Sequence, residues 1–167
     1  SKTVTALGVG KAICDGKLSL ETTAGSLIKS LQGSDLGKAS LREILLMSSG
    51  SSETLTQHTH GITYEETRQY LWSPNGSVKD LVSSPRISTA KSGNKSHDYK
   101  STDPYTAALM VQEATATPFT QWLADNIFNP AGIANTYVLD VDRKGNFLAT
   151  GGVRLSMNDW ILDPVIH

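Results

Sequence analysis

The 167-residue sequence lacks several features that would mark particular classes of protein. It contains one cysteine, Cys14, so no disulfide can form within the chain. No apolar run approaches the length of a membrane span. The formal net charge is −1 at pH 7, which does not favour nucleic acid, an anionic membrane or a strongly charged substrate as partner. The length and the hydrophobic fraction of 38% are sufficient for one domain with a core.

The first residues form the most distinctive stretch. Apolar spacing predicts a helix from Thr3 to Asp15, and Gly16 is a typical residue after a helix end. Gly8 and Gly10 would let another element approach this helix closely. Cys14 is expected to be a small buried side chain rather than a reactive thiol. No signal peptide is visible, but a sequence that opens inside a helical pattern gives no information about a leader.

The remaining pattern predicts mainly helices. Ser40 and Thr63 each precede a glutamate by three residues, as in a capping box. Helices are expected over residues 26–31, 41–47, 64–72 and 77–82, and after the prolines at 104 and 118. A hairpin is expected between 136–140 and 147–149 with its turn at 142–146, followed by a helix that Ser156 caps, through Leu162.

Three polar stretches, 33–37, 51–63 and 83–100, are expected to be loops or turns. His58 and His60 form a His-x-His pair, for which surface histidines are favoured over a metal site because no further ligand is near in sequence. Lys91, Lys95 and Lys100 form a basic cluster, for which a solvated loop is favoured over an anion site.

Candidate chemistry comes from two segments. Lys2 stands at the start of an apolar helix, where burial would disfavour the charged form of its amine and suit it to act as a general base. Tyr99 and Ser101 precede a helix by a few residues, and in an extended turn they would point to the same side. Such a segment would deliver a phenol and a hydroxyl together into a cleft.

Four segments, in this order, resemble one superfamily. They are SKTVTALGVGKAICDGKLSLE, LREILLMSSG, YKSTDPYTAALMVQEATATPFTQWLADNIFNPAGIANT and DRKGNFLATGGVRLSMNDW. They resemble the Ser-x-x-Lys helix, the helix before a Thr-Ser-Gly turn, the Tyr-x-Asn or Tyr-x-Ser loop and the segment before a later active-site strand. These are motifs of serine β-lactamases and penicillin-binding proteins, in the branch with class C β-lactamases, D-alanyl-D-alanine peptidases, family VIII esterases and nylon-oligomer hydrolases.

The resemblance implies an α+β, β-lactamase/transpeptidase-like fold, of which these residues would supply mainly the helical region and a short hairpin. It implies that Lys2 is the base for a serine nucleophile, that Tyr99 passes the proton to the leaving group, and that Ser101 binds substrate. Because many members have Asn where Ser101 stands, the variant favours an amidase or esterase. The reaction implied is acyl transfer through an acyl-enzyme, with no cofactor and no metal.

Two family features are expected outside these residues. The nucleophile should stand three residues before Lys2, which lies upstream of Ser1, and Ser1 itself is about 100° away from Lys2 around the helix. The Lys/His-Thr/Ser-Gly motif should follow Trp160. Residues 1–167 are therefore expected to be a partial domain that packs against the rest of its own polypeptide, and this chain alone is expected to be inactive.

Two other functions stay open. One is a non-catalytic relative that binds peptide or cell-wall ligands as a sensor or scaffold. The other is a helical interaction domain, in which Tyr99 and Ser101 would face solvent far from Lys2. For the enzyme, the expected substrate is a small-molecule or peptide amide or ester. The compartment is open, with a periplasmic or secreted location favoured over the cytoplasm.

Overall fold

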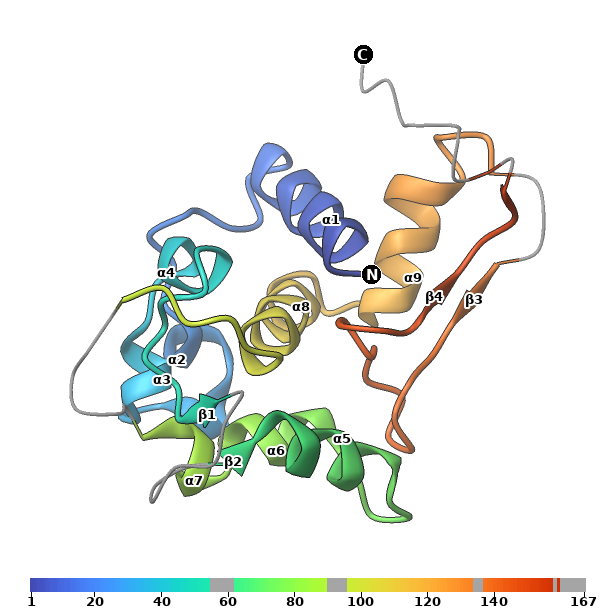
Figure 1. The fold of residues 1–167 in the computed structure, drawn as a ribbon. Helices are drawn as coiled ribbons and strands as arrows, with labels where there is room; N and C mark the ends of the chain where they lie inside the picture. The colour runs from blue at the N-terminus through green and yellow to red at the C-terminus, as the bar shows by residue number, and fades with distance from the viewer. Residues whose placement is uncertain (55–61, 90–95, 134–136, 158, 160–167) are drawn as a thin grey trace.

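The structure is a computed structural model that describes residues 1–54, 62–89, 96–133, 137–157 and 159. Short helices dominate the described chain (Figure 1). In chain order they are α1 (Lys2–Cys14), α2 (Ala24–Leu27), the 3₁₀ turn η1 (Lys29–Leu31), α3 (Asp35–Lys38), α4 (Leu41–Leu45), α5 (Tyr64–Trp72), α6 (Val78–Ser83), α7 (Pro85–Ser88), α8 (Thr102–Thr115), α9 (Phe119–Leu123) and the π-helical η2 (Ala124–Phe128). No helix in these ranges is long and apolar enough to span a membrane.

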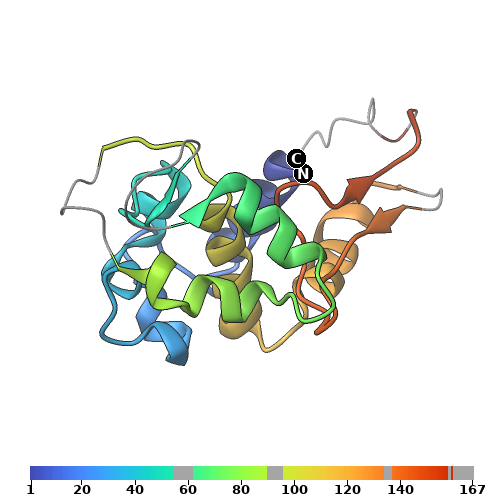
Figure 2. The ribbon, with the colours of Figure 1, turned by 60° about the horizontal axis from the view of Figure 1, so that its bottom comes forward.

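Helix α8 is the centre around which the other elements pack. Its first ten residues, from Thr102 to Val111, are all buried, although several of them are polar. Helices α1, α2, α4, α6 and α9 contact it, and Figure 2 shows α5 and α6 in front of it. The Tyr-Lys-Ser segment, residues 99–101, directly precedes α8, so the packing of α8 in the core holds the C-terminal end of this segment in place.

Helix α1 lies against α9 through a close backbone approach. The indole Nε1 of Trp122 donates to the carbonyl of Gly8 at 2.9 Å. A Cβ atom added to Gly8 would lie 2.8 Å from side-chain atoms of both Phe119 and Leu123, whereas one added to Gly10 would meet nothing within 4 Å. The expected close approach is therefore found at Gly8 and not at Gly10.

The predicted helix starts at Ser40 and Thr63 are confirmed. Both residues form capping boxes, with Glu43 and Glu66 as the reciprocal partners. Two short helices, α3 and α7, begin within the stretches 33–37 and 83–100, which were expected to be loops, so that expectation was wrong. The side chains of Ser34 and Ser84 accept hydrogen bonds from backbone N–H groups two or three residues later and so stabilise the starts of these helices.

Two small strand pairs complete the described fold. Strands β1 (Glu53–Thr54) and β2 (Ile62–Thr63) are parallel, in a segment expected to be only a polar loop. Strand β3 (Val138–Leu139) pairs antiparallel with β4 (Val153–Arg154). The expected hairpin partner, 147–149, makes only a bridge from Phe147 to Val141. The predicted turn at 142–146 is present, because Gly145 N donates to Asp142 O and Asp142 N donates to Asn146 O.

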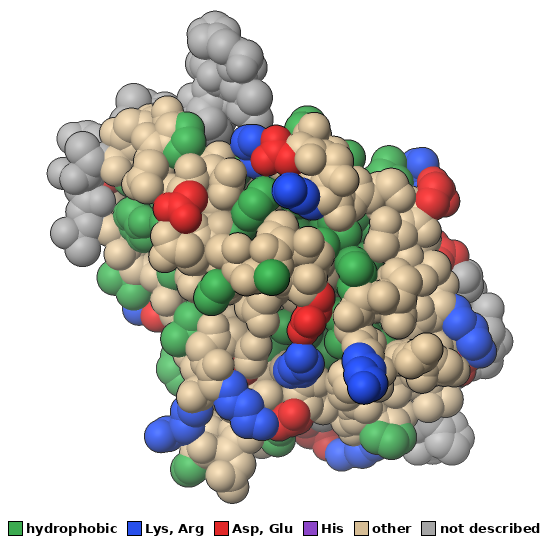
Figure 3. Space-filling view, turned by 180° about the vertical axis from the view of Figure 1, so that it is seen from behind, with side chains coloured by type: hydrophobic (Ala, Val, Ile, Leu, Met, Phe, Trp, Pro, Cys, Tyr) green, Lys and Arg blue, Asp and Glu red, His purple; other side chains and the backbone are tan. Residues whose placement is uncertain are grey.

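Two expectations about exposure were wrong. Cys14 is exposed, because the buried face of α1 includes Ala12, and a residue two positions further lies about 200° around the helix. Lys100 is only 2% exposed and is not part of a solvated basic loop. His58, His60, Lys91 and Lys95 lie outside the described residues. Figure 3 shows acidic and basic side chains interspersed over one face of the molecule.

Candidate active site

The structure brings Lys2 and Tyr99 together. Lys2 is the first residue of α1, and Tyr99 lies in the segment that precedes α8. The Nζ atom of Lys2 lies 4.6 Å from the centroid of the Tyr99 ring, within cation–π distance. The Tyr99 side chain is 47% exposed. This proximity contradicts the helical-interaction-domain hypothesis, which requires the two residues to be far apart.

Ser1 has a structural contact at the start of α1. Its Oγ atom accepts a hydrogen bond from the backbone N–H of Val153 at 3.2 Å. One turn later, the Thr5 hydroxyl lies 3.1 Å from the carbonyl of Ser1 and 3.2 Å from that of Ala149. These contacts attach the first turn of α1, and with it Lys2, to the segment around 149–153.

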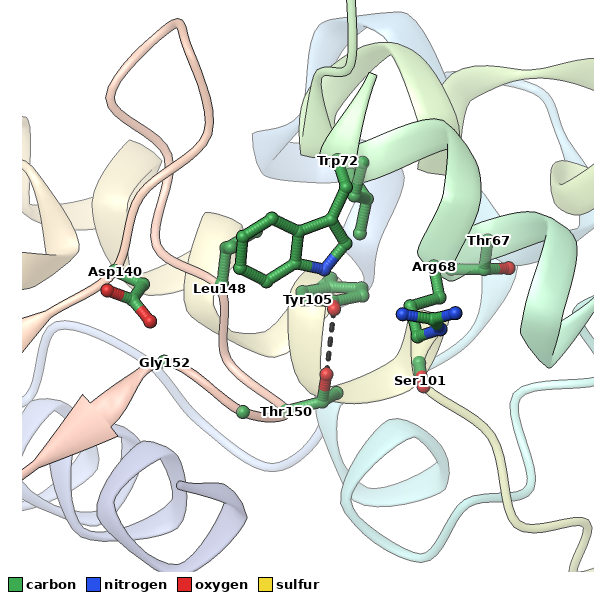
Figure 4. A pocket seen from close by; sticks show the side chains of 11 residues that line it. Thr67, Arg68, Trp72, Ser101, Tyr105, Asp140, Leu148, Thr150 and Gly152 are labelled. Atoms are coloured by element: carbon green, nitrogen blue, oxygen red, sulfur yellow. Dashed lines mark hydrogen bonds between the residues drawn. The ribbon is translucent and has the colours of Figure 1, made fainter.

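Ser101 lies at a cavity of about 170 Å³ (Figure 4). Trp72 and Arg68 line it from α5, Tyr105 from α8, and residues 148–152 close the opposite side. The Tyr105 and Thr150 hydroxyls lie 2.7 Å apart and are hydrogen bonded. Ser101 already has helical backbone angles (φ −93°, ψ −28°), so it is not part of an extended turn with Tyr99. The cavity is therefore lined by Ser101, which is 1% exposed, and by neither Lys2 nor Tyr99.

The cavity wall combines apolar and polar groups, among them the charged side chains of Arg68 and Asp140. The Trp72 side chain is 70% exposed, and Leu148 lies further inside. Arg68 donates to the Glu65 carboxylate at 2.7 and 2.9 Å. The hydrogen bonds from Arg68 and Gln69 lower the pKa of Glu65 to about 2, so this carboxylate stays charged well into acid. Asp140 is likewise paired, because it accepts hydrogen bonds from Arg154 at 3.0 and 2.5 Å. With both charged side chains paired, the cavity suits an uncharged polar or apolar group.

The Tyr-Lys-Ser segment is attached to residues 47–52. The backbone N–H of Asp98 donates to Met47 O at 2.8 Å, and Lys100 Nζ donates to Ser51 O at 3.1 Å. Further along the segment, the hydroxyls of Ser51 and Thr102 lie 2.9 Å apart. Asp103, which is fully buried, accepts from Ser49 Oγ at 2.5 Å.

This supporting network is not apparent from the sequence alone. The one indication in the sequence is that LREILLMSSG resembles the helix before a Thr-Ser-Gly turn, which places serines near the site.

Among the residues that the structure describes, no group of His, Cys, Asp and Glu side chains could hold a metal ion.

Comparison with known proteins gives a family and a fold. The model of the family described as Beta-lactamase matches residues 1–164. A search of curated protein sequences gives no match.

Among solved structures, the chain is similar to a protein described as a 6-aminohexanoate-dimer hydrolase of Bacillus anthracis. The TM-score is 0.78 at 17% identity, over 96% of this chain and 44% of the other. It is also similar to a penicillin-binding protein homologue from Pyrococcus abyssi, described as octameric, with a TM-score of 0.70 at 16% identity over 96% and 42%. A β-lactamase/D-alanine carboxypeptidase from Pseudomonas syringae gives a TM-score of 0.63 at 15% identity over 96% and 47%. The chain spans less than half the length of each of these structures. The expected β-lactamase/transpeptidase-like fold is confirmed.

Proposed function

Because the chain belongs to the beta-lactamase family, we propose that the intact protein is a serine hydrolase of amide or ester bonds that acts through an acyl-enzyme. The observation that carries this proposal is the approach of the Lys2 amine to the Tyr99 ring, from two segments far apart in the sequence. Both residues match motif positions to which the resemblance assigns roles in proton transfer.

The proposed nucleophile is a serine three residues before Lys2. Residues i and i+3 share a helix face, so its hydroxyl would lie beside the amine. In its neutral form, Lys2 takes the hydroxyl proton while the serine oxygen bonds to the substrate carbonyl carbon. Collapse of the tetrahedral intermediate breaks the bond to the leaving group, which receives a proton by way of Tyr99. Water then hydrolyses the acyl-enzyme and restores the serine.

The proposed substrate is a small amide or ester, with Ser101 as a group that binds it. The cavity beside Ser101 offers apolar surface from Trp72 and Leu148 together with the Thr150 hydroxyl. These residues suit an uncharged acyl or amine group. Similar structures include one described as a 6-aminohexanoate-dimer hydrolase and one as a β-lactamase/D-alanine carboxypeptidase, which agrees with acyl transfer as the reaction class.

The proposal is tested by labelling the intact protein with a fluorophosphonate and, separately, with a fluorescent penicillin, and by mapping the adduct with mass spectrometry. We expect a fluorophosphonate adduct on a serine three residues before Lys2. Labelling by the first probe alone indicates an esterase or amidase, and labelling by both indicates a penicillin-reactive enzyme. Any residue other than serine at that position contradicts the proposal and favours the non-catalytic sensor or scaffold.

A further inference from the structure

Lys100 carries a buried amine in the middle of the Tyr-Lys-Ser segment. Its side chain is 2% exposed, although lysine is rarely buried unless it is paired. The Nζ atom donates to the carbonyl oxygen of Ser51 at 3.1 Å and lies 3.7 Å from the Oδ2 atom of Asp98. Removing an amine from water is costly, so these two contacts must compensate for its burial.

Lys100 lies between two other contacts that join its segment to residues 47–52. On the N-terminal side of Tyr99, the hydrogen bond from Asp98 N to Met47 O joins this segment to residues 47–52. On the C-terminal side of Ser101, the hydrogen bond between Ser51 and Thr102 joins it to the same residues. The Lys100 contact lies between these two points, and Lys100 itself stands directly between Tyr99 and Ser101. Tyr99 itself is 47% exposed and so has limited packing of its own.

We propose that Lys100 is a positioning residue, whose amine holds the backbone of Tyr99 and Ser101 against Ser51. This contact keeps the Tyr99 ring over the Lys2 amine and keeps Ser101 at the cavity wall. The inference rests on the proposed function for its kinetic consequence, while its structural consequence can be measured without any activity. Lys100 would not touch the substrate, because its amine points into the protein, toward the carbonyl of Ser51.

The test replaces Lys100 by methionine in the intact protein, which keeps the length of the side chain but removes the charge and the donor. Lys29→Met is the matched control, because Lys29 is exposed on η1. In Lys100→Met, we expect hydrogen–deuterium exchange of the 98–101 amides to rise roughly tenfold or more, while α1 and α8 keep their protection. We expect kcat for a chromogenic ester to fall about 100-fold with KM changed by less than about threefold, because the tyrosine is displaced while the cavity remains.

A second pair of variants keeps the test decisive if Lys100→Met does not fold. Lys100→Gln keeps an N–H donor without charge, and Asp98→Asn removes the charged partner but leaves the bond to Ser51. Both variants should show a smaller rise in hydrogen–deuterium exchange at 98–101 and a smaller loss of kcat than Lys100→Met. If Lys100→Met is unfolded, the rise in exchange in Lys100→Gln and Asp98→Asn should be confined to 98–101.

Three results would overturn the proposal: unchanged exchange at 98–101, exchange that rises equally throughout the protein, or faster local exchange with unchanged kcat in an active enzyme. If the wild-type protein neither labels with fluorophosphonate nor turns over esters, the proposed function fails. A local rise in 98–101 exchange would then still establish that Lys100 holds the segment.

Discussion

The Nζ atom of Lys2 lies 4.6 Å from the centroid of the Tyr99 ring, so the first turn of α1 meets the segment that precedes α8. Each residue is attached to a different part of the protein. The first turn of α1 is hydrogen bonded to residues 149–153 through Ser1 and Thr5. The Tyr99 segment is bonded to residues 47–52, including Ser51. The pair is therefore assembled by the tertiary fold and not by local sequence.

Replacing Lys2 by alanine, or Tyr99 by phenylalanine, should nearly abolish ester hydrolysis by the intact protein. Loss of a general base or acid typically lowers rates by about 10²- to 10⁴-fold, and we expect a fall in kcat of at least this size. Tyr99→Phe removes only the hydroxyl and keeps the ring that contacts Lys2. The measurements are turnover of a chromogenic ester and the thermal unfolding midpoint, which should stay close to that of the wild type.

Lys17→Ala is the matched control for Lys2→Ala, because Lys17 is an exposed lysine that follows α1. Its turnover should equal that of the wild type. Wild-type turnover in both Lys2→Ala and Tyr99→Phe would show that the proposed site is wrong.

Helix starts were the most predictable part of the fold. The capping signals at Ser40 and Thr63 act over three residues, and the structure confirms both. The pairing of β3 was not predictable in the same way. Its partner Val153–Arg154 lies beyond the turn at 142–146 and beyond the expected strand at 147–149. Tertiary contacts therefore determine which segment pairs with β3.

The approach of Tyr99 to Lys2 was predictable only with the help of the resemblance. Polar residues such as Tyr99 and Ser101 before a helix indicate a functional loop, but nothing local brings Tyr99 to Lys2. Lys100 was misassigned to a solvated loop because its burial depends on the carbonyl of Ser51, far away in the sequence. Cys14 was misassigned because apolar residues surround it in sequence while the buried face of α1 points elsewhere.

Glu66 should make the stability of the protein depend on pH in acid. Hydrogen bonds from Thr63, and after them Arg86, hold the pKa of Glu66 below its ordinary value of 4.5. A carboxyl group with a lowered folded-state pKa stabilises the protein above its unfolded-state pKa, and this contribution is lost as pH falls through the folded-state value. We therefore expect wild type to be more stable than Glu66→Gln at neutral pH, by less than about 1 kcal/mol because the group is exposed.

This difference should shrink as pH falls below 4.5, because protonated glutamate and glutamine are both uncharged. Urea unfolding of both proteins across this range is the measurement. A difference that stays constant from neutral pH into acid would show that the Glu66 charge does not stabilise the start of α5.

Asp142 should be a major contributor to stability. The carboxylate is 5% exposed and accepts hydrogen bonds from the backbone N–H of Val78 at 2.7 Å, of Lys144 at 2.8 Å and of Asn146 at 2.9 Å. It thereby joins the 142–146 turn to the start of α6. Because each buried donor left unsatisfied costs about 1–3 kcal/mol, Asp142→Ala should lower the free energy of unfolding by roughly 3 kcal/mol or more.

The neighbouring exposed residue Arg143 provides the control for Asp142. Arg143→Ala should change the free energy of unfolding by less than about 0.5 kcal/mol. In Asp142→Ala, the amide of Val78 should also exchange faster in hydrogen–deuterium exchange. Equal stabilities of the two variants would show that the carboxylate contacts contribute little.

Gly8 and Gly10 should respond to alanine in opposite directions, although they lie two residues apart in one helix. A Cβ at Gly8 would lie 2.8 Å from side-chain atoms of Phe119 and Leu123, so Gly8→Ala overpacks the contact between α1 and α9. We expect a loss of about 1–3 kcal/mol in the free energy of unfolding. At Gly10 there is nothing within 4 Å of the added atom, so the better helix propensity of alanine should instead add about 0.5–1 kcal/mol. Urea unfolding of both variants gives the comparison, and a stabilising Gly8→Ala would mean that α9 does not pack against α1 at this point.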